Sequence, residues 1–316
     1  MEPDGDRAPV LVVLGPTAAG KTAVAVELAH RVNGEVISAD SRAFFRDLNI
    51  LTDKPGLEER SGIPHHLIDC VPIDGTYDAM AFRTDVVRLL PEIRSRGRMP
   101  IVAGGGTLYL GAILRGIFDG PGNDPTVRAA LETQSSASLS DELARVDPDA
   151  ASRIHPNDRL RMIRALEVFR TTGRPISRWH TDAVPLPERF LIAGLTRARD
   201  EHRRVIEERV RRMVARGAFA EIAALAEVGL SPGVQAYRTV GVPEAFEVLS
   251  GRLSEEGFVE TVAQRTWQLA RRQTAWFRRD RDVHWLDMTE TTAARAVDEL
   301  LDRWELPTPG ATEGRR

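Results

Sequence analysis

The sequence predicts an α/β fold in which helices flank a parallel β-sheet. Two observations predict it. Short apolar segments alternate along the chain with segments of helical periodicity, the pattern of parallel α/β domains. The motif GPTAAGKT at 15–22 lies between the first apolar segment and the first helical one, which is the setting of a P-loop. The fold class we expect is a P-loop NTPase-like parallel sheet with a helical insertion and a helical C-terminal part.

Six short apolar segments are expected to be strands. The first, PVLVVL, is uninterrupted apolar sequence, as expected of a strand buried on both faces. The segments are residues 9–14, 34–40, 65–71, 98–106, 189–195 and 283–287. Helical periodicity runs over 21–31 and 78–96, so these segments are expected to be helices of the core.

The chain is expected to divide into one core, one insertion and a tail. Residues 8–119 form the first part of the P-loop core, and residues 188–304 form its remainder with Arg-rich helices. Between them, at 120–187, short helical segments are broken by turns such as DPD and HPND. This stretch is interpreted as a helical insertion, and its segment NDRLRMIRALEVFRTTG has the signals of a capped helix. Residues 305–316 are predicted to be a disordered tail.

Composition places the chain among ordinary globular proteins. Of its 316 residues, 42% are apolar and 28% are charged, and no apolar run approaches the length of a membrane span. The acidic first residues are unlike a signal peptide, so a cytoplasmic location with no membrane partner is expected. A single cysteine, Cys70, excludes an internal disulfide and a cysteine-based zinc site. We expect the chain to act as a monomer.

Charge is unevenly distributed although the net charge is only −3. Residues 153–178 hold seven arginines against two acidic residues, and residues 265–281 hold six against one. A near-neutral total can therefore hide basic surfaces. The arginines of 199–216 alternate with Asp and Glu, which is typical of a solvated helix face. The chain has only two lysines, Lys21 and Lys54.

The P-loop motif predicts a phosphate site. Its glycines let backbone N–H groups turn toward a phosphate, and the helix that follows adds the positive end of its dipole. Lys21 would supply an ammonium for the terminal phosphate, and the Thr22 hydroxyl would be a ligand of Mg²⁺. The motif is typical of nucleotide-binding and ATP-binding proteins. The residues expected to bind a diphosphate are Gly15, Pro16, Thr17, Ala18, Ala19, Gly20, Lys21 and Thr22.

The carboxylate nearest to this site is predicted to be Asp40. An NTPase normally carries a magnesium-binding carboxylate at the end of another strand. The best candidate strand, in 98–106, ends instead in glycines. Asp40 ends the second predicted strand, and strand carboxyl ends converge on the ligand crevice of such sheets. It could serve as a base or a metal ligand, or it could only cap a turn with Ser41.

These motifs together resemble the tRNA dimethylallyltransferase family (isopentenyl-diphosphate:tRNA transferases). The resemblance runs in order over nearly the whole chain. It rests on GPTAAGKT, ISADSR, TDKP at 52–55, IPHHLID at 63–69, the glycine run before LYL at 108–110, HPND followed by RALEVF, and RRQTAWFR at 271–278. Some features, such as IVAGG and GVPE, are also similar to adenylate isopentenyltransferases.

The resemblance implies a reaction and a set of catalytic residues. A dimethylallyl group would pass from dimethylallyl diphosphate to N6 of the adenosine 3′-adjacent to the anticodon, with Mg²⁺ as cofactor and diphosphate released. Asp40 matches the family's catalytic carboxylate and would remove the proton of the weakly nucleophilic amine. Thr17 and Arg238 also fall at positions that the family assigns to the donor and the active site.

The resemblance further implies contacts with the anticodon stem-loop of tRNA. The Arg-rich insertion would grip the stem, and Arg161 and Arg164 lie three apart on one predicted helix face, where they could contact phosphates. The expected tRNA-binding residues are Asp40, Ser41, Arg42, Ala43, Gly106, Arg128, Arg161 and Arg164.

Three other functions remain open at this stage. The same chemistry with AMP, ADP or ATP as acceptor is favoured by departures from the family pattern, such as Gly106 in place of Thr and Trp267 in place of Arg. A P-loop kinase for small molecules would need a magnesium carboxylate that the sequence does not offer. A non-catalytic RNA-binding protein would leave Asp40 beside the P-loop unexplained.

Overall fold

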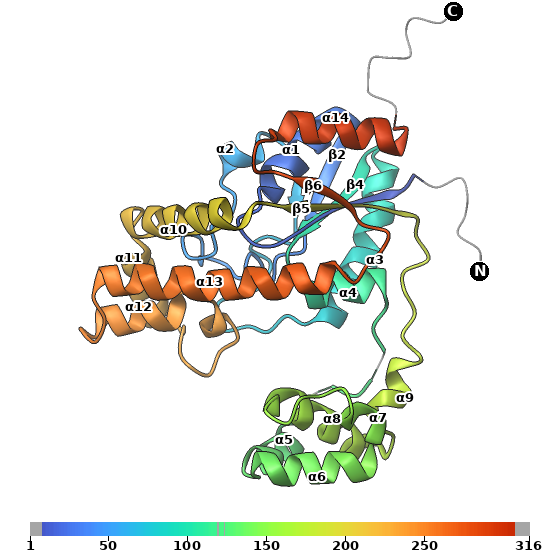
Figure 1. Ribbon diagram of the computed structural model, residues 1–316, viewed down its shortest axis with the longest axis vertical. Helices are drawn as coiled ribbons and strands as arrows, with labels where there is room; N and C mark the ends of the chain where they lie inside the picture. Colours follow the sequence, from blue (N-terminus) through green and yellow to red (C-terminus); the bar gives the residue numbers. More distant parts are fainter. Residues whose placement is uncertain (1–7, 119, 123, 307–316) are drawn as a thin grey trace, which may run out of the picture. The chain divides into compact units, whose positions relative to one another are not determined.

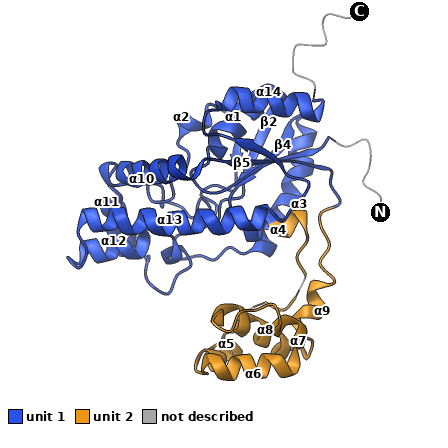
Figure 2. Ribbon diagram, in the orientation of Figure 1, with its two compact units in different colours: residues 1–110, 187–316 blue, residues 111–186 orange. Residues whose placement is uncertain are grey.

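The computed structural model of the protein describes residues 8–118, 120–122 and 124–306. The chain divides into two compact units, shown in Figure 2. Unit 1 comprises residues up to Leu110 and from Pro187 onward, and unit 2 is Gly111–Leu186. Residues 307–316 of the predicted tail lie outside the described residues. None of the described helices combines the length and the apolar character needed to span a membrane.

Unit 1 is built on a six-stranded sheet in the order β3-β2-β4-β1-β5-β6. All five neighbouring pairs are parallel, which confirms the predicted fold class. Every residue of β1 and β2 is buried, as the apolar runs predict. The strands are β1 Val10–Leu14, β2 Gly34–Ser38, β3 His65–His66, β4 Met99–Gly104, β5 Phe190–Thr196 and β6 His284–Asp287.

The third strand is much shorter than its apolar sequence predicts. β3 covers only His65–His66 of the expected segment 65–71. Leu67 and Asp69 both adopt positive φ, 58° and 56°, so the backbone leaves the extended conformation directly after β3. Val71 then makes a separate parallel bridge with Phe45.

Helices cover both faces of this sheet (Figure 1). α1 and α14 pack together on one side and share a core with β1, while α3 and α13 lie on the other. α10 packs along α13, and α11 packs on α12. The helices of unit 1 are α1 Lys21–Val32, α2 Leu57–Arg60, α3 Ala79–Ser95, α10 Arg199–Ala215, α11 Ala218–Glu227, the short 3-10 helix Ala236–Arg238, α12 Val242–Leu249, α13 Glu255–Phe277 and α14 Ala293–Trp304; α4 Thr107–Leu114 runs into unit 2.

Unit 2 is helical, as the sequence predicts for this part of the chain. Its central helix, α8 Arg159–Thr172, begins after the N-cap Asp158 and ends at Gly173, whose φ is 70°. Gly suits this left-handed C-cap because it has no Cβ to clash. The other helices are α5 Pro125–Glu132, α6 Ser136–Val146, α7 Pro148–Ala151 and α9 Ile176–His180.

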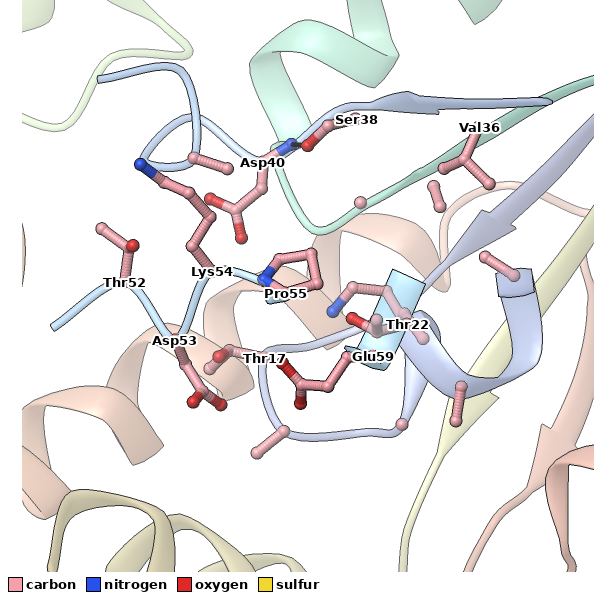
Figure 3. A pocket seen from close by; sticks show the side chains of 18 of the residues that line it. Thr17, Thr22, Val36, Ser38, Asp40, Thr52, Asp53, Lys54, Pro55 and Glu59 are labelled. Atoms are coloured by element: carbon pink, nitrogen blue, oxygen red, sulfur yellow. Dashed lines mark hydrogen bonds between the residues drawn. The ribbon is translucent and has the colours of Figure 1, made fainter. Parts of the chain in front are cut away.

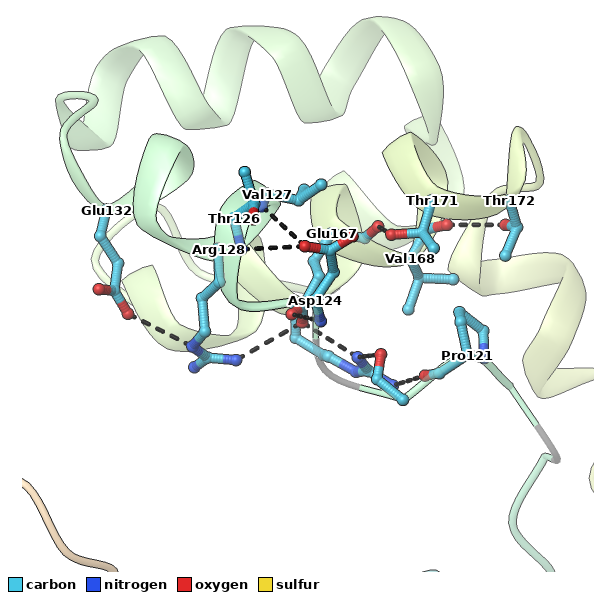
Figure 4. Close-up of polar contacts among 12 residues, drawn as sticks. Pro121, Asp124, Thr126, Val127, Arg128, Glu132, Glu167, Val168, Thr171 and Thr172 are labelled. Atoms are coloured by element: carbon cyan, nitrogen blue, oxygen red, sulfur yellow. Dashed lines mark hydrogen bonds and ion pairs between the residues drawn. The ribbon is translucent and has the colours of Figure 1, made fainter.

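A fully buried carboxylate organises unit 2. Glu167 of α8 has a side-chain exposure of 0% and forms ion pairs with Arg128 and Arg164 (Figure 4). It also accepts the backbone N–H of Asp124 at 3.0 Å, and Arg164 donates to the carbonyl of Pro121 at 2.7 Å. The network therefore attaches the segment that enters α5 to α8.

Replacing Glu167 with Ala should destabilise α8. Two guanidinium groups and one N–H would lose a buried partner, which typically costs about 3–5 kcal/mol. Hydrogen–deuterium exchange of peptides from α8 should become roughly a hundredfold faster or more. Glu132, which pairs with Arg128 at the surface, is the matched control, and Glu132→Ala should change exchange little. Equal exchange in both variants would contradict this account.

Candidate active site

One cavity of about 450 Å³ lies where the carboxyl ends of β1, β2 and β4 meet. Its walls come from the P-loop, from the segment that follows β2, from the end of β4, from residues 52–55 and from α10. Figure 3 shows the side chains of Asp40, Thr17 and Thr22 around this cavity. Ligands of open α/β sheets bind at this edge, between adjacent strand ends. The cavity therefore lies where the sequence predicts a phosphate site.

The P-loop has the backbone conformation that its glycines predict. Gly15 and Gly20 have φ of 148° and 99°, values that L-residues rarely adopt. A Cβ on Gly15 would lie 2.6 Å from the carbonyl oxygen of Leu195 in β5, so only glycine fits there. α1 begins at Lys21 and directs its N-terminus at the cavity. The site thus has the helix end and the turned backbone that bind an anion.

The Lys21 ammonium is the central cation of this site. Its Nζ donates to the Pro16 carbonyl of its own loop at 2.7 Å. Burial lowers the pKa of Lys21 to about 8; the carboxylate of Asp40 raises it in part, and the charge of Arg209 lowers it further. An arriving diphosphate would favour the charged ammonium over the neutral amine.

Thr17 is held by side chains from two distant helices. Its backbone N–H donates to Gln273 Oε1 at 2.9 Å, and its carbonyl accepts from His202 Nε2 at 2.8 Å. Arg209 Nη1 donates to the Thr17 hydroxyl at 2.7 Å. The ring of Trp267 packs edge-on against His202. The predicted donor residue Thr17 is therefore held by α10 and α13. His202 of α10 follows it by 185 residues, and Gln273 of α13 follows it by 256.

Arg209 was not predicted as a site residue, because its helix has the alternating charges of a solvated face. Arg204 and Arg211 do behave in that way and pair with neighbouring glutamates. Arg209 has a side-chain exposure of only 16%, pairs with Asp53 and donates to the Thr52 carbonyl as well as to Thr17. Its neighbours Ile206, Val210 and Met213 are buried. The apolar residues of α10 beside Arg209 were the sequence signal that this side of the helix is buried.

Asp40 lies at the cavity and also forms the turn considered from the sequence. Its Oδ1 accepts the backbone N–H of Arg42 at 2.9 Å. No hydrogen bond within the described part of the chain uses Oδ2, and the residue is half-buried. The turn contact orients the carboxylate, and one oxygen remains for a substrate.

Three of the other predicted residues lie around the Asp40 turn. Ala43 lines the cavity, and Gly106 donates its N–H to the carbonyl of Ala39 at 3.0 Å. Ser41 follows Asp40 directly and is half-buried.

The predicted arginines of unit 1 lie together beside the cavity lining rather than in it. Arg42 donates to the carbonyl of Gln235 at 3.3 Å. Gln235 precedes Arg238 by three residues in the sequence. Burial lowers the pKa of Arg42, and the nearby charge of Arg238 lowers it further. Arg238 is exposed, and neither arginine is among the residues that line the cavity. Of the two, only Arg238 is exposed, and Arg42 is half-buried.

The predicted arginines of unit 2 have different environments. Arg161 has a side-chain exposure of 74% and pairs with Asp158 in its own first turn. Arg128 and Arg164 are bound to the buried Glu167. Arg161 is thus the one whose guanidinium is most exposed among these three, while the other two also stabilise unit 2.

The second lysine is a structural residue. Lys54 is buried, and its Nζ donates to the Phe45 carbonyl, to Asn49 Oδ1 and to Asp69 Oδ1 at 2.7, 3.0 and 2.5 Å. These contacts saturate the three donors of an ammonium. Lys54 therefore holds the segment 45–54 against the loop that follows β3.

The two histidines that form β3 also have protein partners. His66 Nε2 lies 2.7 Å from Oε2 of the buried Glu35, which Arg96 binds as well. His65 Nδ1 lies 2.9 Å from the Ile63 carbonyl. Both contacts position the edge strand of the sheet.

Comparison with known proteins shows the family of this chain. Residues 43–280 match the model of a family described as IPP transferase. The chain belongs to this family. It is 45% identical over 303 residues to a tRNA dimethylallyltransferase of Thermomicrobium roseum, covering 94% of this chain and 92% of the relative. It is 40% identical to a tRNA dimethylallyltransferase of Geobacter sulfurreducens, covering 90% of this chain and 93% of the relative.

Solved structures of the family share the fold. A tRNA isopentenylpyrophosphate transferase from Bacillus halodurans is 34% identical, with a TM-score of 0.71, and the match covers 95% of this chain and 96% of that one. A eukaryotic dimethylallyltransferase acting on tRNA is 28% identical with a TM-score of 0.82, covering 96% of this chain and 82% of that one. The family predicted from the ordered motifs is confirmed.

The pKa of Lys21 predicts how the affinity for an organic diphosphate changes with pH. Binding of the anion requires the ammonium, so affinity should fall as pH rises through about 8, by up to about tenfold per pH unit above it. Calorimetric titration with a non-reactive diphosphate between pH 7 and pH 9.5 measures this. Lys21→Arg keeps its charge over this range, so its affinity should be lower but nearly constant. A flat profile for the unaltered protein would remove Lys21 from diphosphate binding.

Proposed function

We propose that this protein transfers a dimethylallyl group from dimethylallyl diphosphate to N6 of the adenosine 3′-adjacent to the anticodon in tRNA, releasing diphosphate. One observation carries the proposal. A P-loop with a half-buried lysine, Lys21, and a carboxylate with a free oxygen, Asp40, share a single cavity. The relatives described above, which match over about nine-tenths of the chain, are named tRNA dimethylallyltransferases.

The donor diphosphate would bind at the N-terminus of α1. Lys21 and the helix dipole neutralise its charge, and Arg209 adds a guanidinium held beside Thr17. These groups stabilise the negative charge that grows on the leaving diphosphate as the carbon–oxygen bond breaks. Gly15, Pro16, Ala18, Ala19 and Gly20 shape the loop around it.

The residues of the cavity fit a magnesium ion bound together with the diphosphate. The Thr22 side chain is exposed to the cavity, and Asp40 lines the same space. Among the described residues, no group of three His, Cys, Asp or Glu side chains could hold a metal alone. Mg²⁺ commonly takes one or two protein ligands and completes its shell with phosphate oxygens and water. When bound, it would supply further positive charge to the leaving diphosphate.

Asp40 would act on the acceptor. The exocyclic amine of adenine is a weak nucleophile because its lone pair is delocalised into the ring. As the carbon–nitrogen bond forms and the carbon–oxygen bond breaks, the nitrogen becomes acidic, and Asp40 Oδ2 can accept its proton. The target base must leave its stack in the anticodon loop to reach this carboxylate.

The tRNA would be bound by residues in the cavity wall and beyond it. In unit 1 these are Asp40, Ser41, Arg42, Ala43 and Gly106, and in unit 2 Arg161 has the most exposed guanidinium of the three predicted arginines. Arg238 would act as an active-site residue. Arg128 and Arg164 would contribute mainly by stabilising unit 2, with phosphate contact as a second role. The monomeric state and the cytoplasmic location stay predictions.

Incubation with radiolabelled dimethylallyl diphosphate tests the acceptor. Bulk tRNA should be labelled, with diphosphate released in equal amount, whereas AMP and ATP offered separately should not be. Lys21→Ala is the negative control and should abolish the transfer. Efficient labelling of AMP would favour an adenylate isopentenyltransferase, and stoichiometric ADP from ATP would favour a kinase.

Asp40→Asn tests the catalytic base. Asn can keep the turn contact with the Arg42 N–H, since Asn caps about as well as Asp, but it cannot take a proton. The single-turnover rate should fall by about a hundred- to ten-thousandfold, while binding of donor and tRNA changes little. The exposed Asp74 offers a control, Asp74→Asn, which should be neutral. Near-normal transfer would show that Asp40 only forms a turn, and rescue by raised magnesium would show a metal ligand.

A further inference from the structure

Gln273 of α13 connects two loops of the active site. Its exposure is 9%, and both atoms of its amide are used. Oε1 accepts the N–H of Thr17 in the P-loop at 2.9 Å, and Nε2 donates to the carbonyl of Gly105, after β4, at 2.7 Å. A single buried side chain thus joins the P-loop, which would hold the diphosphate, to the glycines at 104–106, called the glycine segment below.

The glycine segment is in turn joined to the residue before Asp40. Gly106 donates its N–H to the Ala39 carbonyl at 3.0 Å, and Ala39 donates to the Ala103 carbonyl at 2.8 Å. A Cβ on Gly104 would lie 2.3 Å from the Ala39 carbonyl oxygen, so these backbones are in close contact. The connection therefore runs from Thr17 through Gln273 and Gly105 to the segment that carries Asp40.

Gln273 and the glycine segment are in close contact, with no room for a side chain between them. A Cβ on Gly105 would lie 2.8 Å from Gln273 Nε2 and 3.1 Å from the Gly15 carbonyl oxygen. The amide is therefore fitted between the P-loop and the glycine segment. Its orientation is defined, because one end must accept from an N–H and the other must donate to a carbonyl.

We propose that Gln273 is a positioning residue that sets the separation between the donor diphosphate and the carboxylate of Asp40. This inference rests on the proposed function. Gln273 touches neither reacting atom. The donor would bind on the P-loop, which Gln273 joins to Gly105, and Asp40 lies on the segment after β2, which contacts the glycines after β4 through Ala39. Displacement of a reacting group by about 1 Å can cost on the order of a hundredfold in rate.

The test compares Gln273→Met with Gln268→Met. Met keeps the length of the side chain and loses both hydrogen bonds, while Gln268 is exposed on the same helix. In Gln273→Met the single-turnover rate should fall by about ten- to a hundredfold, while the affinities for dimethylallyl diphosphate and tRNA change less than about threefold. Gln268→Met should match the unaltered protein. Rates are taken per folded molecule, with the folded fraction measured by thermal unfolding.

A second variant, Gln273→Glu, separates positioning from packing. The ionised carboxylate can accept from Thr17 but cannot donate to Gly105, whereas the protonated form can do both. Its rate relative to Gln273→Met should therefore rise as pH is lowered. Both variants share the titratable neighbours Lys21, Asp40, His202 and Arg209, so the ratio cancels their contributions.

Three outcomes are informative. The expected fall in rate with preserved affinities, together with a pH-dependent ratio, supports the inference. If the unaltered protein transfers the group and Gln273→Met does so at a similar rate, or loses donor affinity in the same proportion, the inference is wrong and the proposed function stands. If the unaltered protein transfers nothing to tRNA, the proposed function fails and the inference fails with it.

Discussion

The close approach of the backbones that follow β1, β2 and β4 is the constraint on which the site depends. Parallel pairing in the order β2-β4-β1 brings three strand ends to one edge. Glycines at 104 and 106 then allow the segment after β4 to touch the Ala39 carbonyl. A side chain at either position would separate the loop that carries Asp40 from the rest of the edge. Backbone contacts rather than side chains therefore set the spacing between the segments after β2 and β4.

Buried polar side chains then divide into two groups. Lys54, Glu35 and Glu167 have saturated protein partners and attach loops or edge strands to their cores. Lys21 and Arg209 form the second group. Both line the cavity, as Lys54 does, and Arg209 pairs with Asp53, whereas the hydrogen bond that the described structure gives Lys21 goes to the uncharged Pro16 carbonyl. Since a buried charge without a counter-ion is costly, Lys21 indicates where an anionic ligand belongs.

Much of the fold could be predicted from local sequence. Apolar runs and helical periodicity located five strands closely, and the caps of α8 were visible as Asp158 and Gly173. The strand expected at 65–71 ended early because Leu67 and Asp69 take positive φ, which apolar sequence does not reveal. The helical character of α10 was predicted, but the role of Arg209 was not, since side-chain direction on a charged helix depends on what packs against it.

The sequence alone determined the phosphate loop, the strand that positions Asp40 and the family to which the chain belongs. These follow from residues close together in the chain, where glycine conformation and strand–helix order act locally. Only the tertiary structure decided which distant side chains complete the site. Gln273, His202 and Arg209 meet Thr17 because α10 and α13 pack beside the sheet, and Arg164 is committed to Glu167 because both face a buried network. Packing between elements far apart in the chain determines which side chains become partners, and the local sequence around each residue does not identify its partner.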